Sequence, residues 1–294
     1  MKIAEKKLTA IFGVALILLM ALSSTAYAIT GNYEPDDGRH PYVGLLVFDV
    51  YDPILEMNMP AWRCTGSLIA PDVVLCAGHC CDGAVAARVW FDEDITYDNV
   101  PFPLYPYGGP GSGAIEGAPY TNPEYRTLPG DPPGNGIPTF SYRDVGIVVL
   151  DEPVYMDEYA ELPTAGLVDT LTVMTDVDLV GYGVQYQVKI PGKELPSPPP
   201  YYRWAGPRCR FYAPAQLLSG EFSWSDEFVR CTANPGRGKG GTAFGDSGGP
   251  VLLGGTNTIL AVNSYVTNVN CRGTTYHSRI DIPEVLAWIG TYMP

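Results

Sequence analysis

Basic residues are scarce in this chain, and this scarcity limits its partners. Its 294 residues include 18 lysines and arginines against 32 aspartates and glutamates, which gives a net charge of −14. Contacts with nucleic-acid phosphates need clustered basic side chains. We therefore expect no nucleic-acid partner, and we expect the negative surface mainly to keep the protein soluble.

Long apolar runs are also missing, apart from one near the N-terminus. Residues 11–22 are apolar except for one glycine, but a helix that spans a membrane needs about 20 such residues. The run follows three lysines and precedes Ala26-Tyr27-Ala28, a small-residue cleavage site. This order predicts a signal peptide over residues 1–28, with an uncleaved anchor as the alternative. We expect residues 29–294 to be a secreted monomer, extracellular or periplasmic, without membrane contact.

Seven cysteines in an exported chain predict disulfides. Because seven is odd, at least one thiol lacks an intramolecular partner. Four neighbouring residues are of types that bind zinc; these are Cys76, His79, Cys80 and Cys81. A zinc site is the alternative to the catalytic role of His79 developed below, and we expect neither a metal nor another cofactor.

The chain has no heptads and no internal repeat, and turn-forming residues interrupt it throughout. Its 33 glycines and 28 prolines separate short runs rich in Val, Ile, Leu and Tyr, a texture typical of an all-β fold. Segments 101–138 and 191–200, rich in glycine or proline, are expected to be surface loops. The clearest predicted strands are 41–50, 62–70, 145–150, 179–183, 228–232, 250–253 and 260–265.

One helix is expected, at the C-terminus. Asp281 is placed to cap it, Pro283 suits its first turn, and Glu284 occupies the capping-box position. Four apolar residues then recur at i, i+3, i+4 and i+7; these are Val285, Trp288, Ile289 and Tyr292.

A serine flanked by glycines stands in the segment Gly245-Asp246-Ser247-Gly248-Gly249-Pro250. Glycine lets the backbone turn tightly and approach a bound ligand. A serine hydroxyl is a poor nucleophile, so it needs a base within hydrogen-bond reach and a third group that orients the base. The chain has only three histidines. His40 precedes a proline and His277 lies in a polar turn, whereas His79 follows the apolar run Val73-Val74-Leu75 and is our candidate base.

The orienting acid should stand beside a buried strand. Asp144 directly precedes the apolar run 145–150, so we expect it to serve this role. A plain turn residue is the alternative for Asp144, and Asp92, Asp94 and Asp151 are weaker candidates for the acid.

The order His79, Asp144, Ser247, and the motifs around these residues, resemble the chymotrypsin-like serine peptidases, which have the trypsin fold. Further segments share the resemblance: Leu75–Cys80, Cys64–Ala70, Gly181–Gly183 and Ser264–Val266. In this family the serine attacks the scissile carbonyl, the histidine takes its proton, and an acyl-enzyme forms. The resemblance implies an oxyanion hole made by the N–H groups of Gly245 and Ser247.

The resemblance implies two packed six-stranded antiparallel β-barrels and a short C-terminal α-helix. The barrels would span about 29–155 and about 156–280, and the helix 281–294.

The family has a disulfide at the positions of Cys64 and Cys80, and Cys209 and Cys231 are a plausible second pair. The remaining cysteines are Cys76, Cys81 and Cys271. Ala243 stands where the family has the partner of Cys271, so we expect Cys271 to be free or weakly paired.

The family also buries a new N-terminal amine against the aspartate that precedes the serine. Here this implies a pair between Ile29 and Asp246, with Ile29 exposed by signal removal alone. Cleavage elsewhere, with Ile29 as an ordinary strand residue, is the alternative.

Six residues are implied in binding the substrate: Gly241, Thr242, Ser264, Tyr265, Val266 and Thr274. Gly241 carries no charge at the base of the pocket, so cleavage after Lys or Arg is not expected. Val266 and Thr274 would narrow the pocket and favour small or medium apolar residues. The alternative is a chymotrypsin-like preference for large apolar residues.

The resemblance therefore predicts an exported serine endopeptidase that acts on proteins or peptides. Two other functions are kept open: a catalytically inactive binding module on the same fold, and an esterase that uses the same three residues.

Overall fold

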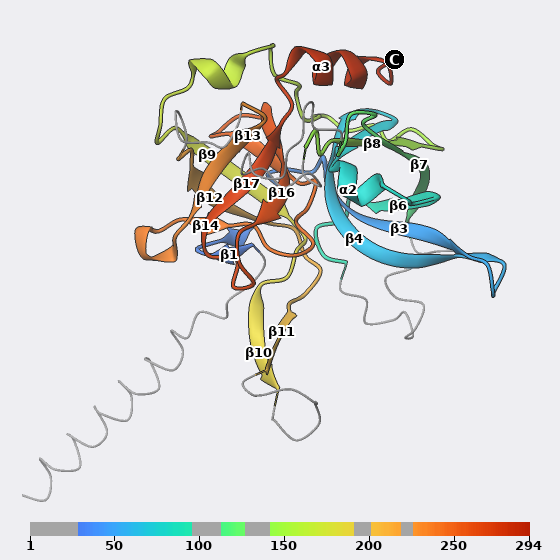
Figure 1. The fold of residues 1–294 in the computed structure, drawn as a ribbon, viewed down its shortest axis with the longest axis horizontal. Helices are drawn as coiled ribbons and strands as arrows, with labels where there is room; N and C mark the ends of the chain where they lie inside the picture. The colour runs from blue at the N-terminus through green and yellow to red at the C-terminus, as the bar shows by residue number, and fades with distance from the viewer. Residues whose placement is uncertain (1–28, 96–112, 127–141, 191–200, 219–225) are drawn as a thin grey trace, which may run out of the picture.

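The computed structural model describes residues 29–95, 113–126, 142–190, 201–218 and 226–294 (Figure 1). The predicted signal peptide, the predicted loop 191–200 and most of the predicted loop 101–138 lie outside the described residues. No helix in the described part of the chain is long and apolar enough to cross a membrane.

Six antiparallel strands close into the first barrel, in the order β3-β4-β5-β8-β7-β6. They are β3 (Val43–Asp52), β4 (Met57–Ala70), β5 (Val73–Cys76), β6 (Ala86–Trp90), β7 (Ile115–Thr121) and β8 (Gly146–Leu150). The predicted barrel is confirmed. Strands β5 and β8 pair in register and are buried almost throughout, which explains why both are continuous apolar runs.

Strand β7 lies within the segment that the sequence predicts to be a loop. Its glycine and proline residues are not typical of a strand, so the sequence does not predict it. In the structure, Gly117 is in close contact with the neighbouring strand β8. A Cβ built on Gly117 would lie 2.6 Å from the carbonyl oxygen of Val149. The glycine that favours a loop in the sequence therefore serves close strand packing.

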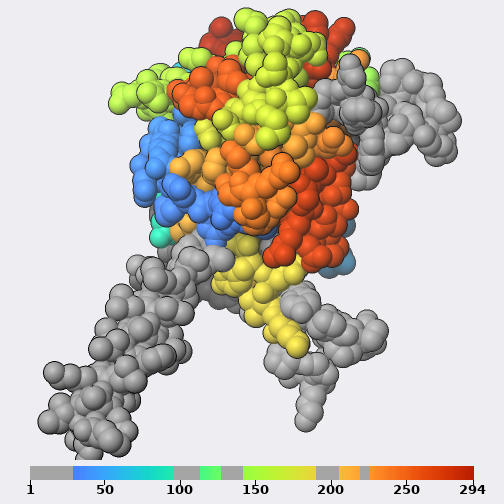
Figure 2. Space-filling view, turned by 90° about the vertical axis from the view of Figure 1, so that its left-hand side faces the viewer, coloured from blue at the N-terminus to red at the C-terminus, as the bar shows by residue number. Residues whose placement is uncertain are grey.

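The second half of the chain forms a seven-stranded sheet with the order β13-β17-β16-β15-β9-β12-β2. Its strands are β2 (Glu34–Pro35), β9 (Asp176–Gly181), β12 (Phe211–Gln216), β13 (Phe228–Ala233), β15 (Pro250–Leu253), β16 (Ile259–Val266) and β17 (Gly273–Arg279). A bridge between Leu217 and Cys231 joins the end of β12 to β13, so the sheet curls into a half-barrel. A separate hairpin of β10 (Tyr186–Ile190) and β11 (Tyr201–Ala205) projects from this half (Figures 1 and 2).

The N-terminal segment of the described chain pairs with the second half, not with the first barrel. Strand β1 (Thr30–Gly31) pairs with β14 (Gly240–Gly241), and β2 pairs with β12. Ile29 is fully buried in the core of the second sheet. The expected division, which assigned all of residues 29–155 to the first barrel, therefore differs from the observed pairing at its N-terminal end.

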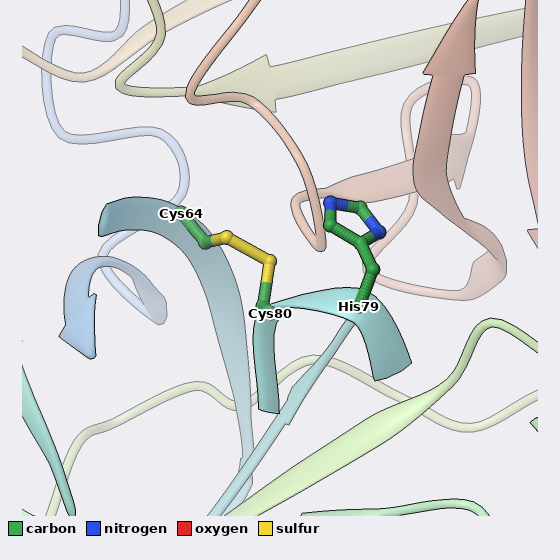
Figure 3. A group of neighbouring side chains, drawn as sticks. All are labelled: Cys64, His79 and Cys80. Carbon is green, nitrogen blue, oxygen red and sulfur yellow. A yellow bond between two sulfur atoms is a disulfide. The ribbon is translucent and has the colours of Figure 1, made fainter. Parts of the chain in front are cut away.

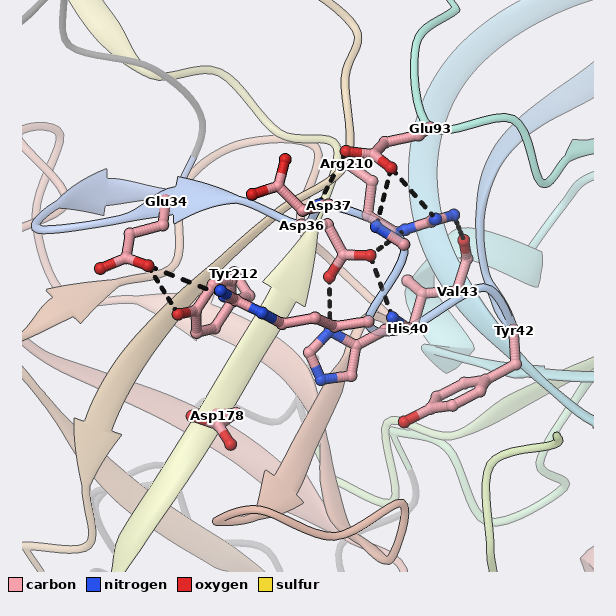
Figure 4. A network of polar contacts seen from close by, with 12 residues as sticks. Glu34, Asp36, Asp37, His40, Tyr42, Val43, Glu93, Asp178, Arg210 and Tyr212 are labelled. Atoms are coloured by element: carbon pink, nitrogen blue, oxygen red, sulfur yellow. Dashed lines mark hydrogen bonds and ion pairs between the residues drawn. The ribbon is translucent and has the colours of Figure 1, made fainter.

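A buried polar network ties this N-terminal segment to both halves (Figure 4). The Arg210 guanidinium donates to the Asp36 carboxylate, to the Val43 carbonyl and to the Tyr182 hydroxyl oxygen. His40 contacts the same carboxylate. Because a buried charge is costly unless it is paired, this network fixes where the segment enters the fold.

The C-terminal helix α3 (Pro283–Gly290) forms where it is predicted, with Pro283 in its first turn. The predicted cap is wrong. The Asp281 carboxylate accepts hydrogen bonds from the Val168 N–H and the Arg279 guanidinium, and no side chain caps the helix. The predicted apolar face does pack on the core, through Val285 and Ile289 and through the partly buried Trp288 and Tyr292.

Candidate active site

His79 and Asp144 meet because the strands before and after them are paired. His79 lies in the single helical turn α2 (Gly78–Cys81), which follows β5, and Asp144 precedes β8. Cys76 at the end of β5 lies opposite Gly146 at the start of β8. The Asp144 carboxylate accepts the His79 backbone N–H at 2.7 Å and contacts Nδ1 of the His79 ring at 2.8 Å.

The buried Asp144 carboxylate fixes the tautomer of His79. An ionised carboxylate only accepts hydrogen bonds, so Nδ1 carries the proton and Nε2 of a neutral ring is left to accept one. Ser264 Oγ donates to the same carboxylate at 2.6 Å. Burial alone would lower the pKa of His79, but the charge of Asp144 and its hydrogen bond to the ring together outweigh burial, and the pKa is raised.

The loop that carries Ser247 is held by backbone contacts on two sides. Thr65 on β4 donates its N–H to the Ser247 carbonyl at 2.8 Å, and the Gly248 N–H donates to the Asn263 carbonyl on β16 at 2.7 Å. Gly248 has a φ of 80°, and a Cβ there would lie 2.5 Å from the Thr65 carbonyl oxygen. Glycine is therefore required at this position.

Asp246, beside the serine, is fully buried and organises the loop from within. Its carboxylate accepts the N–H groups of Gly183 at 2.7 Å and Ala243 at 2.8 Å. Burial raises the pKa of Asp246 to about 7, against the opposing effect of these two hydrogen bonds. No ion pair of this carboxylate occurs among the described residues, so its charge is not fully offset.

A cavity of about 300 Å³ opens between His79 and the loop of Ser247. Four of the residues predicted to bind substrate line it, together with residues that the sequence analysis did not assign to substrate binding. The full lining is His79, Thr242, Ala243, Phe244, Ser247, Asn263, Ser264, Tyr265 and Val266.

Gly241 and Thr274 are absent from this lining. A Cβ built on Gly241 would lie 2.3 Å from the Ala233 Cβ, and Gly241 pairs with Thr30. Thr274 pairs with Thr232 on β13. Phe244 was missed because nothing in its sequence neighbourhood distinguishes it from an ordinary loop residue.

His277 is not in a polar turn, as the sequence suggests, but fully buried on β17. Its ring bridges Asn263 Oδ1 and Thr275 Oγ1, each at 2.9 Å, and the Asn263 amide donates to the Asp246 carbonyl. Burial lowers the pKa of His277 to about 3. The ring is therefore neutral and supports the wall of the cavity.

The predicted disulfide between Cys64 and Cys80 is confirmed, and it lies beside His79 (Figure 3). One ligand atom from each of these three residues falls within 4.8 Å of the others. Zinc binds cysteine as the thiolate, and both sulfurs are used in the disulfide. The alternative zinc site would need Cys80 and His79 as ligands. Cys80 is instead bonded to Cys64, and Nδ1 of His79 contacts Asp144.

The predicted pair of Cys209 and Cys231 is wrong, since no disulfide joins these two cysteines. Cys231 is buried in the core of the second sheet, whereas the Cys209 thiol lies beside the Asp94 carboxylate at 3.2 Å. Cys271 is free and buried. Cys76 and Cys81 are also free and buried, and their sulfurs lie 3.3 Å apart.

Two solved structures, of proteins with different names, are similar to this chain. HL collagenase matches with a TM-score of 0.60 and 17% identity, over 89% of this chain and 96% of that chain. Human heparin binding protein matches with a TM-score of 0.56 and 15% identity, over 88% of this chain and 92% of that chain. No family model and no curated protein sequence matches this chain.

At such low identity the structural likeness concerns the fold, not the activity. One of these relatives is named for an enzymatic activity and the other for binding heparin. The closed β-barrel, the curled half-barrel sheet and the C-terminal helix of this chain match the chymotrypsin-like two-barrel fold. The chain therefore has the chymotrypsin-like two-barrel fold of the trypsin type.

Proposed function

We propose that the protein is an exported serine endopeptidase. The observation that carries this proposal is the His79–Asp144 contact, made at the rim of a cavity that Ser247 also lines. The order of the three residues and the two-barrel fold add support. An inactive binding module would not need the tautomer of His79 to be fixed by a buried carboxylate.

In the proposed reaction Ser247 attacks the scissile carbonyl and Nε2 of His79 takes the hydroxyl proton. The buried carboxylate of Asp144 keeps the proton on Nδ1 and stabilises the imidazolium that forms. The N–H groups of Gly245 and Ser247 receive the negative charge of the tetrahedral intermediate. His79 then protonates the leaving amine, an acyl-enzyme remains, and water attacks it to release the acid.

We further propose that the cavity takes a small or medium apolar side chain. Val266, Tyr265 and Thr242 line it and no charged carboxylate does, so a basic substrate residue would gain no ion pair there. Each buried substrate methylene is worth about 0.8 kcal/mol, and Val266 should limit the depth. A preference for large apolar residues is the second candidate, supported by the aromatic lining from Phe244 and Tyr265.

The protein would act after loss of residues 1–28, when the new amine of Ile29 reaches Asp246. The burial of Ile29 and the buried Asp246 carboxylate, which forms no ion pair among the described residues, support this proposal. It places the active enzyme outside the cell, where the disulfide beside His79 would be stable.

Turnover of casein by the secreted protein tests the function. Activity that disappears in Ser247→Ala, with the unfolding transition unchanged, is the expected result. A folded wild-type protein that starts at Ile29 and cleaves neither casein nor small esters would favour the binding module.

A further inference from the structure

A cationic position borders the loop of Ser247 outside the lining of the cavity. Arg63 lies on β4, next to Cys64 and two residues before Thr65. Thr65 donates its N–H to the Ser247 carbonyl and its hydroxyl to the Gly245 carbonyl. A Cβ built on Gly245 would lie 3.3 Å from Nε and 3.8 Å from Cζ of Arg63. The Arg63 guanidinium therefore covers the residue proposed to form the oxyanion hole.

The charge of Arg63 has no direct counter-charge in the part of the chain that the structure describes. Asp246 is the acid whose charge acts on it, but no ion pair joins the two, and the Asp246 carboxylate already accepts two backbone N–H groups. The side chain is mostly buried yet retains some exposure, so a ligand can reach it. Burial lowers the pKa of Arg63, which indicates that an added anion would be favourable.

The location of Arg63 assigns it to the part of a substrate that follows the scissile bond. The cavity proposed for the acyl side chain extends from Ser247 toward Ala243 and Val266, and Arg63 is not part of its lining. We expect a chain whose carbonyl lies at Ser247, and whose side chain fills this cavity, to continue past Gly245. Strand β4 contacts Gly245 through the Thr65 hydroxyl, and Arg63 lies beside it.

We propose that Arg63 binds a carboxylate on one of the two residues that follow the scissile bond. A planar guanidinium matches a carboxylate through paired hydrogen bonds. The carboxylate could be an Asp or Glu side chain or the free terminus of a short leaving peptide. This subsite rests on the proposed peptidase function and defines its substrates more narrowly.

The test compares peptides that differ only after the scissile bond. Glu is compared with Gln at each of the two positions, in peptides with amidated C-termini. A third peptide has Gln at both positions and ends there with a free carboxylate. A charge-assisted hydrogen bond predicts about tenfold higher kcat/KM for Glu than for Gln at one position, and a smaller ratio at high salt. A gain limited to the third peptide would identify the terminal carboxylate as the ligand.

Variants of Arg63 separate recognition from folding. Arg63→Gln should bring the Glu to Gln ratio close to one, and Arg63→Lys should retain part of it. Arg237→Gln removes the same charge from an exposed position and should leave the ratio unchanged. A purely structural role of Arg63 would change the rates for both peptides equally and leave the ratio intact.

Binding to the Ser247→Ala protein distinguishes failure of this subsite from failure of the proposed function. The same Glu to Gln preference should appear in dissociation constants measured with labelled peptides. If the protein cleaves the peptides with a Glu to Gln ratio of kcat/KM near one, the proposed subsite is wrong but the peptidase function stands. The same holds if the ratio is unchanged in Arg63→Gln. Absent turnover together with a binding preference lost in Arg63→Gln would support the carboxylate site and overturn the peptidase.

Discussion

At the scale of single residues, the Asp144 carboxylate holds His79 in place. One carboxylate contacts both its ring and its backbone N–H, and a second donor, Ser264, holds that carboxylate in place. The sequence singled out His79, Asp144 and Ser247, because each stands in a distinctive local motif. It could not reveal the second role of Ser264, which depends on the approach of β16 to Asp144 across the fold.

The pH dependence of catalysis follows from the raised pKa of His79. The neutral ring is the base, so kcat/KM should rise with pH as the imidazolium loses its proton. Because the Asp144 charge raises this pKa, the acid limb should have its midpoint above 6.5, the ordinary value for histidine. Asp144→Asn should lower kcat by about 10⁴. Steady-state kinetics from pH 5 to 9 checks both expectations, and a midpoint below 6.5 would contradict the first.

Val266 and Thr274 were both predicted to narrow the substrate pocket, but the structure distinguishes them. Val266 lines the cavity and Thr274 does not. Val266→Gly should therefore raise kcat/KM for Phe relative to Val before the scissile bond by about tenfold or more, as burial of several methylenes predicts. Thr274→Ala is the matched control, for which we expect no change in this ratio. The opposite outcome, with the control alone changing specificity, would move the pocket wall to Thr274.

At the scale of elements, apolar runs were predictable and glycine-rich strands were not. Strands β8 and β15 are buried runs and lie within one residue of their predicted bounds, and the buried strand β5 contains the apolar run 73–75. Strands β7, β12 and β17 contain glycine, proline or polar residues that pack against partners distant in sequence. Their burial depends on tertiary contacts, such as that of Gly117 with β8, which no local pattern encodes.

Cysteine pairing shows the same limit. Cys64 and Cys80 were predicted from a family motif, whereas the pair of Cys209 and Cys231 was chosen from the cysteines left over. The structure puts the latter two in different environments, one of them beside Asp94. Sequence alone cannot tell which strands carry two sulfurs toward each other.

A new disulfide should form at Cys271. Its thiol lies beside the backbone N–H of Phe244, which follows Ala243. Ala243→Cys should therefore link the serine loop to the loop of Cys271, and should raise the free energy of unfolding by about 2–4 kcal/mol. Denaturant unfolding with and without a reductant measures the gain. The same substitution combined with Cys271→Ser is the control. A gain that persists in the double variant, or under reducing conditions, would show that no such bond formed.

At the scale of the whole molecule, the two halves are joined by the N-terminal segment as well as by the crossover between β8 and β9. Strands β1 and β2 pair with the second half. The Asp36–Arg210 ion pair locks the segment at a junction that also contacts Val43 at the start of β3 (Figure 4). This arrangement leads the buried Ile29 into the half of the molecule that holds Asp246 and Ser247.

Stability should depend on the residue at which the mature chain starts. Without a cationic partner, the folded pKa of Asp246 is about 7 against 3.8 for the ordinary group. Its contribution is therefore most favourable below pH 3.8 and is lost as the pH rises toward 7. The amine of Ile29 should offset this loss, so a chain that starts at Ile29 should unfold at a higher temperature at pH 7.5 than one with an added N-terminal residue.

Replacement of the carboxylate provides the control for this comparison. In Asp246→Asn the two chain starts should unfold at the same temperature, because the amine has no charge to pair with. Calorimetry at pH 5 and pH 7.5 tests this. Equal stability of the two wild-type chains at pH 7.5 would show that Ile29 is an ordinary strand residue.

In the proposed reaction, Ser247 is a nucleophile activated by His79 and Asp144. Reaction with a fluorophosphonate, followed by peptide mass spectrometry, measures this directly, because the probe bonds covalently to an activated serine. We predict a single phosphonylated residue, Ser247, in the chain that starts at Ile29, with labelling abolished in Ser247→Ala and strongly slowed in His79→Ala. A folded protein in which Ser247 stays unlabelled, or is labelled equally fast without His79, would contradict the account.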